Sequence, residues 1–75
     1  MKVLIFDLST RQYLAPGGTR TASPGDAQDF EYSMSAYYEA RREIAGEFQV
    51  VFYLADADIV MNVIRGTGEA VAVAN

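Results

Sequence analysis

Residues 33–55, SMSAYYEARREIAGEFQVVFYLA, decide the fold, because the spacing of their apolar residues changes partway along the segment. In the first half, apolar side chains recur at steps of three and four residues, which is typical of an amphipathic helix. We predict that this helix runs from Ser33 or Ser35 to about Ala45, and that Gly46 ends it in the left-handed conformation. Its predicted buried stripe consists of Met34, Tyr37, Tyr38, Arg41, Ile44 and Ala45.

The second half of the segment has a period of two. Apolar side chains alternate with their neighbours at Phe48, Val50 and Phe52, so a strand is predicted from Glu47 onward. A turn at residues 56–58 and a second strand at residues 59–65 follow. Two glycines predict a further turn at residues 66–68 into a last strand at residues 70–74, which makes this half an antiparallel meander.

The N-terminal half reads as a hairpin followed by a long loop. The apolar run at residues 3–8 predicts a strand, and residues 12–15 return beside it. Residues 16–26 hold both prolines and half of the glycines, which predicts a loop. Within that loop, SPGD at residues 23–26 has the pattern of a helix start, with Ala27 and Phe30 on the buried side of a single turn.

These elements predict an α+β fold of order ββαβββ in a single domain, residues 1–75. The helix can bury its stripe only against the sheet. We therefore expect an antiparallel sheet of four to five strands with one main helix packed on one face. The strand order stays open, because residues 3–8 could join the edge of the meander or stand apart.

The composition excludes most enzyme chemistry. The 75 residues contain no Cys and no His, so a thiolate nucleophile, a disulfide and an imidazole base are all excluded. A net charge of −4 opposes direct binding to nucleic acid. Asp7 interrupts the only N-terminal apolar run, which is too short for a signal peptide or a membrane span. We expect a non-enzymatic cytoplasmic protein without cofactor, metal or membrane contact.

Three weak motifs are better explained as structure than as sites. Asp7 ends the first strand, where some enzymes hold Mg²⁺, but this chain has room for one crossover at most. Asp56 and Asp58 offer two carboxylates, whereas Ca²⁺ takes roughly six to eight oxygen ligands. The glycines at 17–18 and 66–68 neither open a helix nor precede a lysine, as a phosphate loop requires. We interpret all three as turns or strand ends.

Acidic residues are concentrated in the middle of the chain. Residues 26–58 hold eight acids and two arginines, a local charge of −6, whereas residues 1–25 carry +2. Glu39, Glu43 and Glu47 recur every four residues, as on one face of a helix. Tyrosine suits both cores and binding surfaces. The predicted partner-binding residues are Asp29, Glu31, Glu39, Glu43, Glu47 and Tyr38. The alternative is a solvated helix face with local ion pairs between Glu39 or Glu43 and Arg42.

The runs QYLAPGG at residues 12–18 and SPGDAQDF at residues 23–30 resemble a pattern in small uncharacterised bacterial, phage or plasmid proteins. In that pattern a hairpin ends in Tyr-Leu, a polar loop follows, and Ala and Phe three apart precede a helix. The resemblance covers about residues 3–45 and implies an α+β module with no activity attached. Small size, regional acidity and the lack of catalytic side chains also resemble anti-CRISPR proteins, which block bacterial defence complexes by binding them. This second likeness assigns no residue.

We therefore expect a small acidic protein-binding module, a phage or mobile-element inhibitor of the anti-CRISPR type, acting in the cytoplasm of a bacterial host cell. Its expected partner is a protein with a basic surface, such as a CRISPR effector subunit. The chain itself would be a monomer or homodimer. The alternative is a structural or assembly subunit that self-associates through a C-terminal β-edge at residues 69–74.

Overall fold

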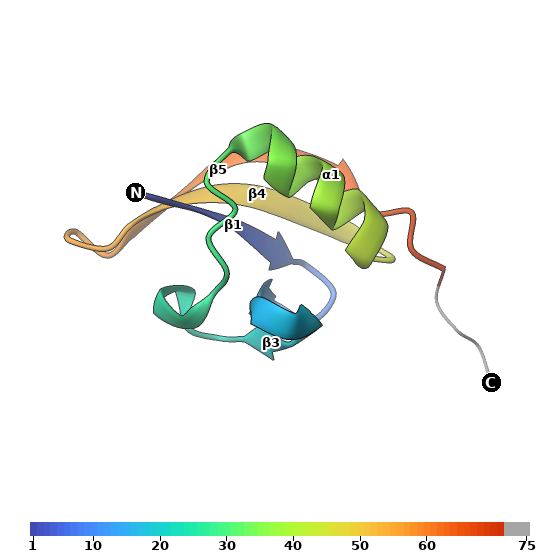
Figure 1. Ribbon diagram of the computed structural model, residues 1–75, viewed down its shortest axis with the longest axis horizontal. Helices are drawn as coiled ribbons and strands as arrows, with labels where there is room; N and C mark the ends of the chain where they lie inside the picture. The colour runs from blue at the N-terminus through green and yellow to red at the C-terminus, as the bar shows by residue number, and fades with distance from the viewer. Residues whose placement is uncertain (72–75) are drawn as a thin grey trace.

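The computed structural model describes residues 1–71, and within them the chain forms one α-helix and a five-stranded antiparallel sheet (Figure 1). The predicted α+β fold is confirmed. The strands lie in the order β3-β2-β1-β4-β5. The elements are β1 (Lys2–Asp7), β2 (Gln12–Leu14), the 3₁₀ turn η1 (Pro16–Gly18), β3 (Arg20–Thr21), the 3₁₀ turn η2 (Pro24–Asp26), α1 (Ser33–Glu43), β4 (Glu47–Leu54) and β5 (Ile59–Thr67).

Strand β1 lies at the centre of the sheet, which answers the question of strand order left open by the sequence. It pairs with β4 along its whole length, from Lys2 opposite Tyr53 to Asp7 opposite Phe48. Its other edge pairs with β2 only at Phe6 and Asp7. The two most apolar strands of the chain are therefore neighbours in the interior of the sheet, where both of their edges are hydrogen-bonded.

One face of the sheet packs against α1. The helix contributes the buried Ala36 and Ala40, and Ile44, the residue directly after the helix, is buried beside them. Because two of these side chains are alanines, the helix can approach the strands closely. The sheet residues of this helix-side cluster are Val3, Ile5, Leu14, Phe48 and Val50.

The helix is rotated relative to the predicted stripe. Met34 and Tyr38 are half or more exposed, and Ala45 is also exposed. Of the predicted stripe, Ile44 is buried and Tyr37 is half-buried against the cluster. The prediction counted the large amphipathic residues as core, whereas the small alanines face the sheet.

The opposite face of the sheet has a core of its own. Leu4 of β1 and Val51 and Tyr53 of β4 are buried there with Ala27, which follows η2. Phe6 and Tyr13 pack against them, with ring centroids 5.0 Å apart. The prediction of a core on one face missed this second cluster. Its signal is the unbroken apolar run at residues 3–6, since a strand buried on both faces does not alternate.

The segment at residues 28–30 completes the free half of the β1 edge. The Phe30 amide donates to the Val3 carbonyl at 2.9 Å, and the Gln28 amide donates to the Leu14 carbonyl at 3.0 Å. The Asp29 carboxylate accepts from the Val3 amide at 3.0 Å and from the Glu31 amide at 2.9 Å. These bonds hold the long connection against the sheet just before α1 begins.

The C-terminal half is a two-stranded hairpin rather than the predicted meander. Strand β5 continues through Gly66 to Thr67, so residues 66–68 do not turn back into another strand. The fifth strand of the sheet is β3, inside the predicted loop. Ala70 and Val71 are not in a strand, and the rest of the strand predicted at residues 70–74 lies outside the described residues.

The end of α1 also differs from the prediction. The helix ends at Glu43, and Ile44 follows in an extended conformation with φ −115°. Gly46 does not have a positive φ, and the chain bends at residues 45–46 before β4 begins at Glu47. A single helical turn is present at SPGD as the 3₁₀ turn η2, although the Ser23 side chain makes no capping hydrogen bond.

Candidate functional site

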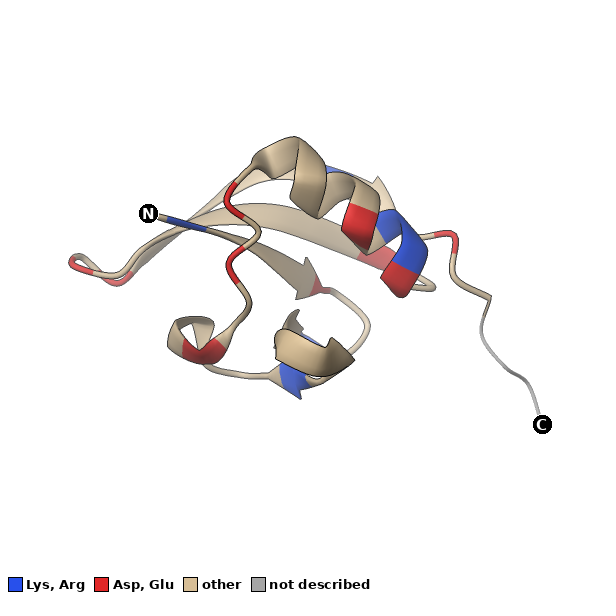
Figure 2. Ribbon diagram, viewed as in Figure 1, with Lys and Arg blue, Asp and Glu red and all other residues tan. Residues whose placement is uncertain are grey.

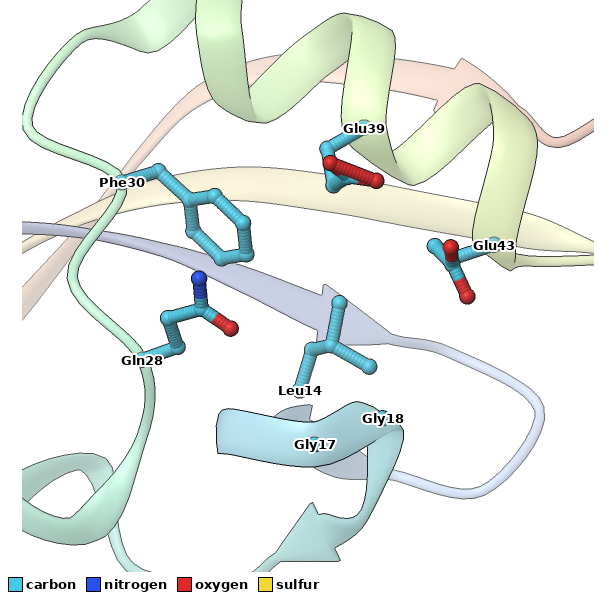
Figure 3. A pocket seen from close by; sticks show the side chains of 7 residues that line it. All are labelled: Leu14, Gly17, Gly18, Gln28, Phe30, Glu39 and Glu43. Atoms are coloured by element: carbon cyan, nitrogen blue, oxygen red, sulfur yellow. The ribbon is translucent and has the colours of Figure 1, made fainter.

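A cleft of about 310 Å³ lies between α1 and the η1 turn (Figure 3). Its walls combine two carboxylates, an amide, two apolar side chains and two glycines. The lining residues are Leu14, Gly17, Gly18, Gln28, Phe30, Glu39 and Glu43. The cleft is therefore both acidic and partly apolar.

The acidic wall follows from the phase of the helix. Glu39 and Glu43 are four residues apart, so they lie on one side of α1 beside the buried Ala36 and Ala40. In Figure 3 both carboxylates point from the helix toward η1. The opposite wall is the η1 turn, whose Gly17 and Gly18 both have φ 79°, a conformation that glycine adopts without strain.

The two carboxylates differ in their partners. The Arg42 guanidinium donates to both oxygens of Glu39 at 2.7 Å, which is the local ion pair that the alternative interpretation predicts. Within residues 1–71 no ion pair reaches Glu43. Two acids and one arginine leave this wall with a net negative charge.

The structure brings only some of the predicted partner-binding residues together. Glu39 and Glu43 share the cleft, whereas Asp29 and Glu31 lie on the connection before α1. Glu47 lies on the other face of the sheet, because the adjacent Phe48 faces the helix. Figure 2 shows acidic residues on several sides of the molecule.

The other four predicted residues, Asp29, Glu31, Glu47 and Tyr38, have different local environments. The Asp29 carboxylate accepts hydrogen bonds from the Val3 and Glu31 amides. These bonds lower the pKa of Asp29, and the bond from Val3 has the largest effect. Glu31 has a left-handed backbone with φ 67°. Glu47 accepts a hydrogen bond from Arg65 at 3.2 Å. Tyr38 is exposed on α1, with its ring 5.7 Å from that of Tyr37.

The sequence did not predict the apolar residues of the cleft or the η1 turn that forms its opposite wall. Leu14, Gln28 and Phe30 come from separate segments, and no spacing rule connects them with the acids of a later helix. Phe30 was predicted to be buried, and it does pack against the helix-side cluster while lining the cleft. No local signal in the sequence identifies the contribution of η1.

Asp7, at the strand end where some enzymes hold Mg²⁺, accepts hydrogen bonds from neighbouring parts of this chain. It is buried, and its carboxylate accepts from the Ser9 hydroxyl at 2.7 Å and the Ser9 amide at 3.0 Å. Arg20 of β3 donates to its second oxygen at 3.2 Å. Burial raises the pKa of Asp7, but the hydrogen bonds from Ser9 and Arg20 outweigh burial and bring the pKa below its usual value. The carboxylate thus connects β1 to the short outer strand β3.

Replacing Asp7 by asparagine should lower the free energy of unfolding at neutral pH by about 1–3 kcal/mol, because Arg20 and Ser9 lose a charged acceptor. Since the folded-state pKa is lowered, ionised Asp7 stabilises the fold fully above the unfolded-state pKa of about 3.9. That stabilisation is lost as the pH falls through the lower folded-state pKa. Urea unfolding at neutral pH and near pH 3 measures both effects. Equal stability of D7N and wild type at neutral pH would contradict the assignment.

Among residues 1–71, no cluster of three or more acidic side chains is arranged to hold a metal ion. The helix within that part of the chain is too short and too polar to cross a membrane.

Comparison with protein-family models, with curated proteins and with solved structures finds no match for this chain.

Proposed function

We propose that this chain is a non-enzymatic binding module that docks on a basic surface of another protein through the cleft between α1 and η1. The observation that carries the proposal is the position of Glu39 and Glu43, which lie on one helix flank and line the same cleft as Leu14 and Phe30. A Lys or Arg side chain has a matching composition. Its aliphatic stem would contact the apolar residues while its charged head met the carboxylates.

The specific form of the proposal is an inhibitor of a host nucleic-acid-binding complex, of the anti-CRISPR type. The surface that such a complex uses for phosphates is basic, and a protein of net charge −4 could compete for it. The proposed partner is thus a bacterial protein with exposed Lys and Arg side chains, such as a CRISPR effector subunit.

Reversing the charge of both cleft acids, in E39K/E43K, should weaken partner binding by at least about tenfold, because attraction becomes repulsion. The fold should survive, since both residues lie on the helix flank outside the core. Capture from a bacterial lysate on immobilised protein, followed by a binding titration with the captured protein, measures the loss. E47K is the control for one such reversal: it makes half the charge change of the double variant, on the other face of the sheet and outside the cleft.

Salt provides the second readout. Raising the ionic strength from about 0.1 M to about 1 M shortens the Debye length from about 10 Å to about 3 Å, so affinity should fall steeply. The proposal fails if E39K/E43K and wild type retain the same proteins, or if the affinity does not depend on salt.

A further inference from the structure

Strand β5 is the edge of the sheet, and among residues 1–71 no other strand pairs with its outer side. It is nine residues long and rich in β-branched side chains, yet it contains neither Lys nor Pro. Natural edge strands are commonly protected by those residues or by being short. Four of its large apolar side chains, Ile59, Val60, Met61 and Val63, are between 40% and 48% exposed. This is an open, apolar sheet edge.

The direction of the free backbone groups follows from two hydrogen bonds. The Gly46 carbonyl accepts from Gly68, on the β5 side of β4, whereas the next carbonyl, of Glu47, accepts from Leu8 on the β1 side. Because these directions alternate along an antiparallel strand, Val51 and Tyr53 also face β1. Their partners on β5 are Asn62 and Val60.

Val60 and Asn62 therefore direct their N–H and C=O groups away from β4, toward the open edge. Beyond Asn62, Val63 has no partner in the register, because Ile64 pairs with Val50 and Asn62 pairs with Val51. This bulge confines regular pairing at the outer edge to the stretch from Ile59 to Asn62. Any strand that adds there would bond to Val60 and Asn62.

We infer that β5 pairs antiparallel with β5 of a second copy of this chain, about a two-fold axis at Met61. Val60 of each copy then lies opposite Asn62 of the other, and reciprocal main-chain hydrogen bonds form at both pairs. The sheets of the two copies become one continuous sheet with both helices on the same side.

Charge complementarity favours a second copy as the occupant. Arg65 lies four residues beyond Met61, and Ala57 lies four residues before it, between Asp56 and Asp58. Pairing through Val60 and Asn62 brings Arg65 of each copy, which lies beyond the bulge and also contacts Glu47 of its own chain at 3.2 Å, toward the acidic hairpin tip of the other. Both groups lie on the face away from α1, since Arg65 pairs with Gln49 and Asp58 accepts from the Tyr53 hydroxyl at 3.3 Å. The tip extends beyond the rest of the sheet in Figure 1, where a partner can reach it.

The helix supplies an independent observation. Tyr37 packs on the β5 side of α1, since a Cβ added at Gly66 would lie 3.0 Å from its ring. Met34 and Tyr38 adjoin Tyr37 on the helix surface and are 50% and 59% exposed. Across the two-fold axis the Tyr37 flanks of the two helices face one another, whereas Tyr38, two residues from both Ala36 and Ala40, points away from the sheet and stays exposed. The acidic cleft is on the other flank of α1 and stays open.

The test is the molecular mass in solution, by light scattering and sedimentation from micromolar to millimolar concentration. Wild type should approach twice the monomer mass as concentration rises. Met61→Lys should raise the dimer dissociation constant at least about tenfold, because two like charges meet at the axis. Thr10→Lys, which adds the same charge in the exposed β1–β2 turn, should leave dimerisation unchanged. A wild type that stays monomeric throughout, or an M61K variant that dimerises equally well, overturns the proposal.

Hydrogen exchange on the wild type provides a readout that needs no variant. Protection of the Val60 and Asn62 amides should increase with protein concentration, whereas the Met61 amide, which faces β4, should be protected at every concentration. Val60→Pro removes only an outward N–H and should also give a monomer. If V60P does not fold, the exchange data still decide: concentration-independent exchange at Val60 and Asn62 contradicts the pairing.

Discussion

Replacing Phe48 by alanine should remove most of the protein's stability at 25 °C. Phe48 is fully buried on the helix side of β4, and its ring contacts Tyr37 at a centroid distance of 5.7 Å. Truncating a buried phenylalanine costs about 3–5 kcal/mol, through lost transfer energy and the cavity left behind. Domains are stable by only about 5–15 kcal/mol, and one of 75 residues belongs near the lower end.

Circular dichroism during urea unfolding measures this loss, and Phe52→Ala is the matched control. Phe52 lies four residues further along the same face of β4 but is only half-buried, so its truncation should cost clearly less. A Phe48→Ala variant with the wild-type urea midpoint would show that the helix-side cluster does not hold the fold together.

Replacing Gly68 by alanine should be nearly as damaging, although it adds a single methyl group. A Cβ at this position would lie 1.6 Å from the carbonyl oxygen of Ile44 and 2.4 Å from its carbonyl carbon. These are backbone atoms at the end of α1, so no side-chain rotation relieves the clash. The chain after β5 must move away, and the bonds from Gly68 to Gly46, Glu69 to Arg41 and Ala70 to Ile44 are disturbed together. We expect a loss of about 2–4 kcal/mol from strain and unmade hydrogen bonds.

Gly46→Ala is the control for this variant. A Cβ at Gly46 meets nothing within 4 Å, and its φ is not positive, so alanine should be neutral or slightly stabilising. Thermal unfolding of both variants distinguishes a steric effect from a general cost of replacing glycine. Similar melting temperatures for G68A and G46A would contradict the close approach.

The sequence predicts the elements whose evidence is local. The change of period at Gly46 identifies α1 and β4, and the Ser-Thr turn after Leu8 identifies the first hairpin. The errors arise where distant contacts decide. Gly66 resembles a turn residue, but it lies within β5 opposite Phe48, whose ring occupies the space that a Cβ would need. Strand β3 is two residues long and depends on pairing with β2, which no local pattern encodes.

The candidate site divides in the same way. The four-residue spacing of Glu39 and Glu43 predicts a shared helix flank, and the structure places both on it. The same spacing fails at Glu47, because the helix ends at Glu43 and Glu47 is the first residue of β4. Its side chain lies on the face of the sheet opposite α1. Phe30 and Leu14 join the cleft only because the connection at residues 28–30 is hydrogen-bonded to β1 and β2.

The pairing of β1 with β4 has a consequence for how the protein is made. Residues 2–7 pair along their whole length only with residues 48–53, so a nascent chain cannot form this part of the sheet until residues 48–53 have left the ribosome. Contacts between such distant segments slow folding, because a large loop must be ordered first. The apolar segment at residues 3–6 is therefore without its partner until residues 48–53 emerge, and this is when a chaperone would have most to bind.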